Sequence, residues 1–425
     1  MPVSDLTIDG LGPLGDGICE SPQGRVFVER ALPGETVKAR LFQDKQKVWR
    51  GELVEILAPS EYRKPAPCVH YDVCGGCSLQ HLKDDIYRQW KTEMVRAAFT
   101  RQKLRPREWK PTFYSGPGTR RRGTFSLSKK GRGFQVGYYL RRSDAVSDID
   151  SCLVLDSELL AFRSVLKSVF EPLVASGSVV DVFLQKIGDW IDMVIVGPIG
   201  RHREPTDAVL EQLEEGLSDT SVARVSWAER EKDEAQALFF RTDIEAHFGG
   251  LQVALPPAAF LQPTPEGESA LVQSVLSELP MKGKFADLFS GCGTFSGHLL
   301  ARGPVDAFEV SPAAVKALSE AGRGKPLRVF RRDLFQKPLR PDELNRYDAV
   351  ILDPPRAGCP EQVAELSRSK VGVVVAVSCN PATLVRDARV LCDGGYWLQS
   401  VQVIDQFLWS HHVEAVAVFT KRKKR

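Results

Sequence analysis

The sequence lacks long hydrophobic runs. In its 425 residues, no stretch approaches the roughly 18 consecutive apolar residues that indicate a membrane-spanning helix. The first ten residues have no basic segment followed by an apolar one, which is the pattern of a secretory signal. These absences remove membrane and exported proteins from our expectations, and a cytoplasmic location follows by default.

A strong excess of one charge is also missing. The formal net charge is +3, which by itself does not indicate a nucleic-acid partner, so the distribution of charge matters more. Between Arg120 and Arg142 there are eight Lys or Arg residues and no Asp or Glu, and Phe125, Phe134 and Tyr138 are interleaved with them. This pattern predicts a folded strand with a basic face rather than a solvated charged run.

The length predicts two or three domains. Residues 1–58 alternate apolar and polar positions between Gly and Pro turns, which predicts a small OB-like β-barrel, a class that often binds oligonucleotides. A purely structural β module is the alternative. Residues 59–253 have a mixed pattern that predicts an α+β central domain. It includes a helix over 84–101 whose apolar face is predicted from Ile86, Trp90, Met94, Ala97 and Ala98.

Residues 254–425 differ from the rest of the chain. Apolar runs typical of buried parallel strands alternate with helical stretches, which predicts a doubly wound, Rossmann-like α/β sheet. Ligands of such sheets bind at the carboxyl ends of the strands. The runs in this segment end on polar or glycine-rich residues, so we expect the chemistry there.

A glycine loop follows the first of these runs. Asp287 to Thr294 follows a strand and opens a helix, and Gly291 and Gly293 permit a tight turn near a ligand. An acidic residue for a ribose is expected near the end of the next strand, where Glu309 lies. Ser296 occupies the position of the third glycine of the dinucleotide pattern, which favours S-adenosylmethionine over NAD. A structural turn is the remaining alternative.

A second strand-end motif is Asp353-Pro354-Pro355-Arg356. Two prolines fix the backbone just past an apolar run and present Asp353 at its end. A rigid turn is the alternative. The fourth position is Arg356, whereas methyltransferases that act on exocyclic amines have an aromatic residue there.

Cys379 follows the apolar run that ends at Val377, in Ser378-Cys379-Asn380-Pro381. An isolated free cysteine is usually a small apolar core residue, but polar neighbours at a strand end favour chemistry. One reaction that requires a thiol is the methylation of carbon 5 of uracil. This carbon is a poor nucleophile, and addition of a thiolate to carbon 6 makes carbon 5 electron-rich. Covalent catalysis of this kind divides one hard step into easier ones. We therefore predict that Cys379 is a nucleophile.

The same reaction needs a base that removes the proton of carbon 5. Glu414 begins an alternating apolar run, and burial among apolar neighbours would raise its pKa into a useful range. A solvent-facing strand position is the alternative. His411 and His412 are rival bases.

Nine cysteines in an expected cytoplasmic protein indicate metal binding or catalysis rather than disulfides. The spacing Cys-x5-Cys-x2-Cys predicts a metal site, with a more distant cysteine as the fourth ligand: Cys68, Cys74, Cys77 and Cys152. Four thiolates suit an iron–sulfur cluster. Zinc with His70 or His81 as the fourth ligand is the alternative.

These motifs resemble bacterial RNA uracil-5 methyltransferases, specifically the 23S rRNA branch that carries a TRAM domain and a 4Fe–4S cluster. The resemblance runs over nearly the whole chain and includes the Arg120-Arg121-Arg122 strand, Phe260-Leu261-Gln262 and His412-Val413-Glu414. It implies that Cys379 is the nucleophile and Glu414 the base. It also implies a cofactor and base pocket lined by Gln262, Phe289, Thr294, Glu309, Asp333 and Asp353. The implied partner is RNA, most closely 23S rRNA, with no membrane, and we expect a monomer.

Three other functions stay open from the sequence. A tRNA uracil-5 methyltransferase uses the same chemistry, although that branch lacks the β module and the cluster. An RNA cytosine-5 methyltransferase carries a cysteine in the strand-end motif that here reads Asp353-Pro354-Pro355. A non-enzymatic RNA-binding protein would need neither Cys379 nor Glu414.

Overall fold

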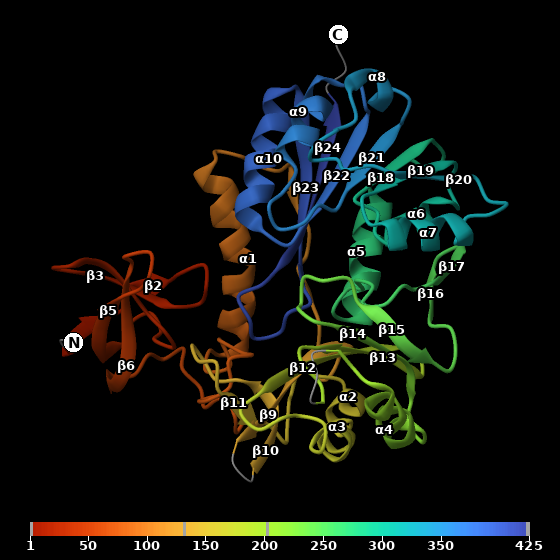
Figure 1. Ribbon diagram of the computed structural model, residues 1–425. Coiled ribbons are helices and arrows are strands. Elements are labelled where there is room, and N and C mark those ends of the chain that lie inside the picture. Colours follow the sequence, from red (N-terminus) through yellow and green to blue (C-terminus); the bar gives the residue numbers. More distant parts are fainter. Residues whose placement is uncertain (1–2, 131–132, 201–203, 422–425) are drawn as a thin grey trace.

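The computed structural model describes residues 3–130, 133–200 and 204–421. Three sheets and one β-hairpin account for the strands of these residues. In Figure 1 a small N-terminal sheet stands to one side, and two larger units lie one above the other. Within the described ranges, no helix combines the length and the apolar character needed to cross a membrane.

The N-terminal sheet has the strand order β1-β5-β6-β4-β3-β2. The strands expected from the alternating pattern are present, because every second residue points into a core of small aliphatic side chains such as Val26, Val37 and Leu41. The six strands are β1 (Val3–Thr7), β2 (Gly10–Leu11), β3 (Gly17–Ser21), β4 (Gly24–Val28), β5 (Thr36–Gln43) and β6 (Trp49–Ala58).

The central sheet has the order β11-β10-β9-β12-β13-β14-β15. Three helices bury Leu159, Leu166 and Leu213 against it, in one core with Phe125 and Val182. The strands are β9 (Arg122–Lys130), β10 (Gly133–Tyr139), β11 (Val146–Asp148), β12 (Val179–Ile187), β13 (Trp190–Val196), β14 (Val222–Ala228) and β15 (Gln236–Phe240), and the helices are α2 (Ser157–Ala161), α3 (Arg163–Phe170) and α4 (Asp207–Leu217). A hairpin of β16 (Glu245–Phe248) and β17 (Leu251–Ala254) leads to the third sheet.

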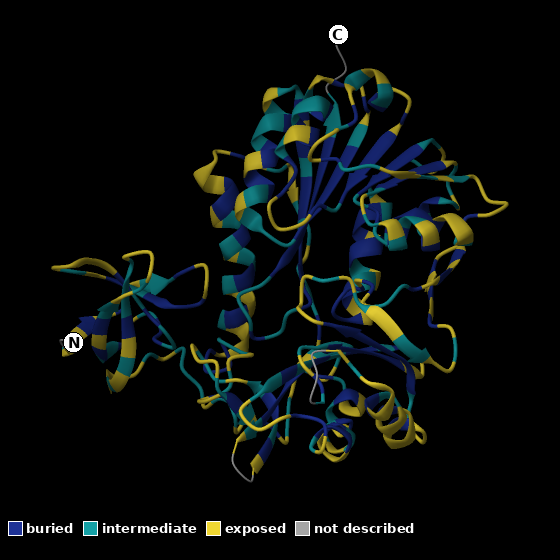
Figure 2. Ribbon diagram, viewed as in Figure 1, coloured by how far each residue is buried: buried dark blue, intermediate teal, exposed yellow. Residues whose placement is uncertain are grey.

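The third sheet has nine strands in the order β20-β19-β18-β21-β22-β24-β23-β7, with β8 also paired to β23. Helices cover both faces, so the predicted α/β class is confirmed, and the strands between them are buried (Figure 2). The strands are β18 (Phe285–Leu288), β19 (Val305–Glu309), β20 (Leu327–Arg331), β21 (Ala349–Leu352), β22 (Val373–Ser378), β23 (Tyr396–Asp405) and β24 (Glu414–Lys421). The helices are α5 (Pro265–Ser277), α6 (Thr294–Leu299), α7 (Pro312–Ala321), α8 (Pro341–Leu344), α9 (Pro360–Arg368) and α10 (Pro381–Asp393).

Part of the segment expected in the central domain joins this third sheet. The strands β7 (Glu108–Trp109) and β8 (Phe113–Tyr114) pair with β23, and α1 (Asp84–Arg101) packs beside it, contributing Val95, Ala98 and Phe99 to the core. Residues 59–253 therefore contribute to two sheets rather than one.

The predicted helix over 84–101 is confirmed, and its predicted apolar face is confirmed in part. Ala98 is buried in the core and Met94 packs against it, whereas Ile86 and Trp90 are only half-buried and Ala97 is exposed. The inward stripe also contains Tyr87, Lys91 and Val95, which the pattern did not select. A lysine occupies the inward stripe because it has an ion-pair partner inside the protein, as described below.

Candidate active site

The carboxyl ends of five parallel strands meet at one edge of the third sheet. The strands β18 to β22 run parallel, whereas β24 runs antiparallel to β22, so β24 begins at the edge where β22 ends. Ser378 pairs with Ala415 in this register. One position further along, Cys379 just past β22 and Glu414 at the start of β24 are neighbours in this register, and the charge of Glu414 acts on the Cys379 thiol. Residues 35 positions apart in the chain thus meet because the last strand reverses.

Cys379 lies between the end of β22 and the start of α10. The side chain of Asn380 accepts a hydrogen bond from the backbone N–H of Ala382 at 3.1 Å, and Pro381 opens the helix. The thiol is half-buried. Burial raises its pKa and the neighbouring Glu414 raises it further, while the guanidinium of Arg356 lowers it.

Glu414 is buried, with 6% of its surface exposed. Burial raises the pKa of Glu414 well above its ordinary value, and the nearby carboxyl of Asp353 acts in the same direction. Arg122, Arg356 and a hydrogen bond with Gln406 oppose this shift without cancelling it. A carboxylate with a raised pKa is a stronger base, as removal of a carbon-bound proton requires.

The two rival bases are weaker. Burial lowers the pKa of His412 to about 4, and the neighbouring His411 and Arg356 lower it too. The Nδ1 atom of His412 lies 2.5 Å from Nη2 of Arg356, so this ring nitrogen is already engaged. Burial also lowers the pKa of His411. A low pKa makes either ring a poor proton acceptor, which favours Glu414.

Three residues near the pair were not assigned a role from the sequence. Gln406 donates from Nε2 to Oε1 of Gln262 at 2.6 Å, which places the predicted Gln262 beside Glu414 through one shared neighbour. The guanidinium of Arg122 lies 4.3 Å from the ring centroid of Phe260 and interacts electrostatically with Glu414. The basic strand β9 therefore begins near Glu414. In this stretch, Arg132 lies outside the described residues. The third of these residues is Arg356, whose guanidinium lowers the pKa of the Cys379 thiol.

The glycine loop has the backbone expected for close approach to a ligand. Phe289, Gly291 and Gly293 have φ values of 64°, 52° and 95°, a region in which glycine is favoured. Thr294 is the first residue of α6. In this loop Asp287 Oδ1 and Ser290 Oγ are buried without a hydrogen-bond partner in the protein. Because buried polar atoms are normally paired, these two atoms fit a polar ligand.

Two acidic side chains at neighbouring strand ends are held by backbone N–H groups. Glu309 accepts hydrogen bonds from Gly291 at 3.0 Å, Val310 at 2.7 Å and Ser311 at 2.8 Å. Asp333 accepts one from Phe335 at 2.9 Å. Both carboxylates are fixed at the edge where the glycine loop lies.

The carboxyl groups of Asp353 and Asp287 interact with each other. Burial raises the pKa of each to about 7, and the charge of Asp287 contributes to the shift of Asp353. The edge therefore brings together Phe289, Thr294, Glu309, Asp333, Asp353, Cys379 and Glu414, and Gln262 joins them through Gln406.

Four cysteines in a different part of the molecule interact electrostatically. Cys68, Cys74, Cys77 and Cys152 are half-buried free thiols, and the charges of the other three raise the pKa of Cys77, after burial as the larger cause. The backbone N–H of Gly76 donates to Cys74 Sγ at 3.3 Å. Among the residues that the structure describes, no three His, Cys, Asp or Glu side chains are grouped closely enough to hold a metal ion. The donor chemistry suits a cluster.

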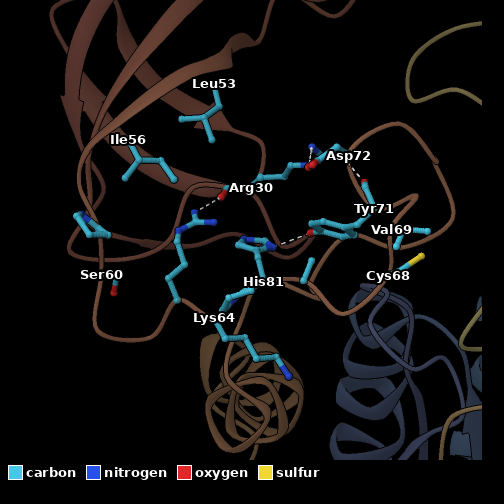
Figure 3. A pocket seen from close by; sticks show the side chains of 14 residues that line it. Arg30, Leu53, Ile56, Ser60, Lys64, Cys68, Val69, Tyr71, Asp72 and His81 are labelled. Atoms are coloured by element: carbon cyan, nitrogen blue, oxygen red, sulfur yellow. Dashed lines mark hydrogen bonds and ion pairs between the residues drawn. The ribbon is translucent and has the colours of Figure 1, made fainter.

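An open cavity of about 770 Å³ lies between the N-terminal sheet and the cysteine loop (Figure 3), and Cys379 is not among its lining residues. Arg30, Arg63 and Lys64 line it, and each is paired with a carboxylate: Asp72, Glu35 and Asp84. Its cations are already neutralised, so we assign no anion site to it.

The parallel sheet contains one reversed strand, β24, and a glycine loop follows β18. These features are typical of a class I methyltransferase fold. A solved tRNA (uracil-54, C5)-methyltransferase from Pyrococcus abyssi, in complex with S-adenosyl-L-homocysteine, has this fold. It matches with a TM-score of 0.77 over 98% of this chain and 99% of that chain, at 22% identity.

The sequence comparisons identify the family. The family model described as tRNA (Uracil-5-)-methyltransferase matches residues 305–423. An uncharacterized RNA methyltransferase of Caulobacter vibrioides is 39% identical over 99% of this chain and 100% of its own length. The 23S rRNA (uracil(1939)-C(5))-methyltransferase RlmD of Chromohalobacter salexigens is 30% identical over 99% of this chain and 90% of its own. The chain belongs to the S-adenosylmethionine-dependent RNA uracil-5 methyltransferase family.

Proposed function

We propose that this protein methylates carbon 5 of a uracil in 23S rRNA, with Cys379 as the nucleophile and Glu414 as the base. The observation that carries the proposal is the register of β22 and β24, which sets a thiol beside a buried carboxylate. They lie at the edge of the sheet where doubly wound folds bind their ligands.

The thiolate of Cys379 would form a bond to carbon 6 of the uracil, which leaves the electron pair on carbon 5 and the adjacent carbonyl. S-adenosylmethionine supplies an electrophilic methyl group on a sulfonium. Once carbon 5 carries the methyl group, its remaining proton passes to the carboxylate of Glu414. The electron pair of that C–H bond re-forms the double bond and expels the thiolate of Cys379. The two side chains thus act on adjacent ring carbons, as their adjacent positions allow.

The residues proposed to hold the cofactor and the uracil ring are Gln262, Phe289, Thr294, Glu309, Asp333 and Asp353. The unpaired buried atoms Asp287 Oδ1 and Ser290 Oγ support a polar ligand beside them. The fixed carboxylate of Glu309 suits the hydroxyl groups of a ribose.

The rRNA substrate is inferred from the name of the Chromohalobacter relative. We propose that the N-terminal sheet is a TRAM-type RNA-binding module, and that β9 with its basic residues contributes to the same surface. A ribosomal substrate implies action in the cytoplasm, and we propose that the protein acts as a monomer.

We further propose that Cys68, Cys74, Cys77 and Cys152 hold a 4Fe–4S cluster, because four sulfur donors suit iron–sulfur chemistry. In the two alternative zinc ligands one ring nitrogen is engaged: His70 Nε2 lies 2.6 Å from Asp150 Oδ1, and His81 Nδ1 lies 2.6 Å from the hydroxyl of Tyr71. Their second nitrogens are not used in these bonds, and His81 Nε2 is buried without a partner, so zinc is the alternative that the metal content decides. Protein purified without oxygen should contain iron and acid-labile sulfide. Fully active protein that contains only zinc would contradict the cluster.

The mechanism is tested by trapping with 5-fluorouracil RNA, because fluorine at carbon 5 cannot leave as a proton. Wild-type protein with S-adenosylmethionine should form an adduct that survives denaturing electrophoresis. Cys379→Ala should form none while it still binds the cofactor, and Glu414→Gln should form it without turning over ordinary RNA. Transcripts of 23S rRNA and of tRNA serve as parallel substrates. Adduct formation by Cys379→Ala would overturn the assignment, and methylation of tRNA alone would replace the rRNA substrate.

A further inference from the structure

The segment 406–413 joins β23 to β24 and leads directly into Glu414. It also carries Gln406, whose side chain is hydrogen-bonded to Glu414. The position of the Glu414 carboxylate therefore depends on how this segment is held. Three side chains outside the segment, and the backbone of the cysteine loop, form hydrogen bonds with it.

A buried ion pair lies beneath the segment. Lys91 on α1 donates from Nζ to Asp405 Oδ1 at 2.9 Å, and the same ammonium donates to the backbone carbonyl of His412. The side chains of Lys91 and Asp405 are 0% and 1% exposed. The pair thus reaches to within two residues of Glu414.

Tyr87, one helical turn before Lys91, completes the contact. Its hydroxyl donates to Asp405 Oδ2 at 2.6 Å and accepts from the backbone N–H of Trp409 at 2.9 Å. The backbone N–H of Phe407 donates to Asp405 Oδ1 at 3.1 Å. Asp405 is therefore the centre of a buried network that holds both ends of the segment.

The middle of the segment is attached to the cysteine loop. The carbonyl of Trp409 accepts hydrogen bonds from the backbone N–H groups of Ser78 at 2.9 Å and Leu79 at 3.0 Å. The side chain of Trp409 packs in a core with Leu79, Leu82 and Tyr87. Trp409 has a φ of 57°, a conformation that a bulky residue holds only when its surroundings impose it. The segment is clamped rather than free.

A buried ion pair of this kind contributes little net stability, since desolvation of the two charges offsets their attraction. Its hydrogen bonds end on the backbone of the segment before Glu414. We propose that Tyr87, Lys91 and Asp405 are positioning residues that hold segment 406–413 so that Glu414 can take the proton from carbon 5. This inference rests on the proposed function of Glu414.

The network should affect one half of the reaction. Cys379 is held by β22 and α10, which the hydrogen bonds of Tyr87, Lys91 and Asp405 do not contact. The segment reaches the thiol indirectly, through the ring of His412 beside Arg356. Removal of the proton should therefore slow more than attack on carbon 6 and methyl transfer. The covalent RNA complex should then accumulate on ordinary uracil RNA, where it is normally short-lived.

The test compares Tyr87→Phe with Tyr396→Phe in the full-length protein. Tyr396 is a matched control, because its buried hydroxyl donates to Val371 at 3.0 Å and is not bonded to segment 406–413. Tyr87→Phe should reduce turnover about tenfold, as expected for a small displacement of a reacting group. It should form the 5-fluorouracil adduct at the wild-type rate and accumulate the covalent complex on uracil RNA. Deuterium at carbon 5 should slow Tyr87→Phe more than wild-type protein.

Lys91→Met is the second variant, which keeps the length of the side chain and removes the contact with His412. It should give the same pattern, and if it does not fold, Tyr87→Phe decides alone. Equal loss of adduct formation and turnover, or the same behaviour in Tyr396→Phe, would overturn the inference. A wild-type protein that forms no adduct would overturn the proposed function and this inference together, so the two failures are distinguishable.

Discussion

Two glycines of the cofactor loop should respond differently to alanine. Both have a positive φ, so a Cβ costs about 1 kcal/mol of backbone strain at either position. At Gly293 the Cβ would also lie 2.5 Å from Leu318 Cδ1, and such overpacking adds about 1–3 kcal/mol. A Cβ at Gly291 would have no protein atom within 4 Å apart from its two chain neighbours. Gly293→Ala should thus cost about 3 kcal/mol and Gly291→Ala about 1 kcal/mol.

Thermal melting and cofactor titration separate the two effects. For a unit of this size 1 kcal/mol corresponds to roughly 2–4 °C, so Gly293→Ala should melt roughly 6–12 °C lower and Gly291→Ala roughly 2–4 °C lower. Gly291→Ala should bind S-adenosylhomocysteine at least about tenfold more weakly, because its Cβ enters the ligand space. Gly324→Ala is the control, since Gly324 has a φ of 74° and open space in a distant turn. Wild-type affinity in Gly291→Ala would refute the placement of the cofactor.

Three further changes have defined outcomes. Arg356 lowers the pKa of the Cys379 thiol, so Arg356→Gln should move the acid limb of the pH–rate profile to higher pH, and the activity lost at neutral pH should return in alkali. Cys77→Ser should lose the visible absorption and iron of anaerobically purified protein, with no change in cofactor affinity. Burial raises the pKa of Glu35, but hydrogen bonds from Arg63 and the backbone hold it below its ordinary value. The N-terminal sheet should therefore lose stability as pH falls through this lowered pKa, and Arg63→Gln should cost about 3–5 kcal/mol, measured by limited proteolysis.

The site could be predicted from the sequence wherever its residues end strands. Apolar runs locate the strands, and the carboxyl ends of parallel strands share one edge, so Glu309, Asp353 and Cys379 follow from local pattern. Glu414 required a different signal, because it begins its strand rather than ending one. Its place beside Cys379 depends on the reversal of β24, which no local periodicity encodes.

The residues that were missed have partners far away in the chain. Lys91 was given no place on the apolar face of the helix, since periodicity cannot reveal that Asp405, 314 residues later, neutralises it. Arg122 and Gln406 likewise reach Glu414 only through the packing of separate segments. Sequence pattern alone therefore does not place a buried charged residue on the inward face of a helix.

Burial has opposite consequences for the two members of the pair. It raises the pKa of Glu414, which makes a better base, and it raises the pKa of Cys379, which suppresses the thiolate that must attack. The negative charge of Glu414 adds to the second effect. Only positive charge near the sulfur reverses it, and Arg356 supplies part of that charge. In the proposed reaction the remainder would come from a bound sulfonium. The thiol would then become nucleophilic chiefly when the methyl donor is present, which couples the first step to the availability of the second.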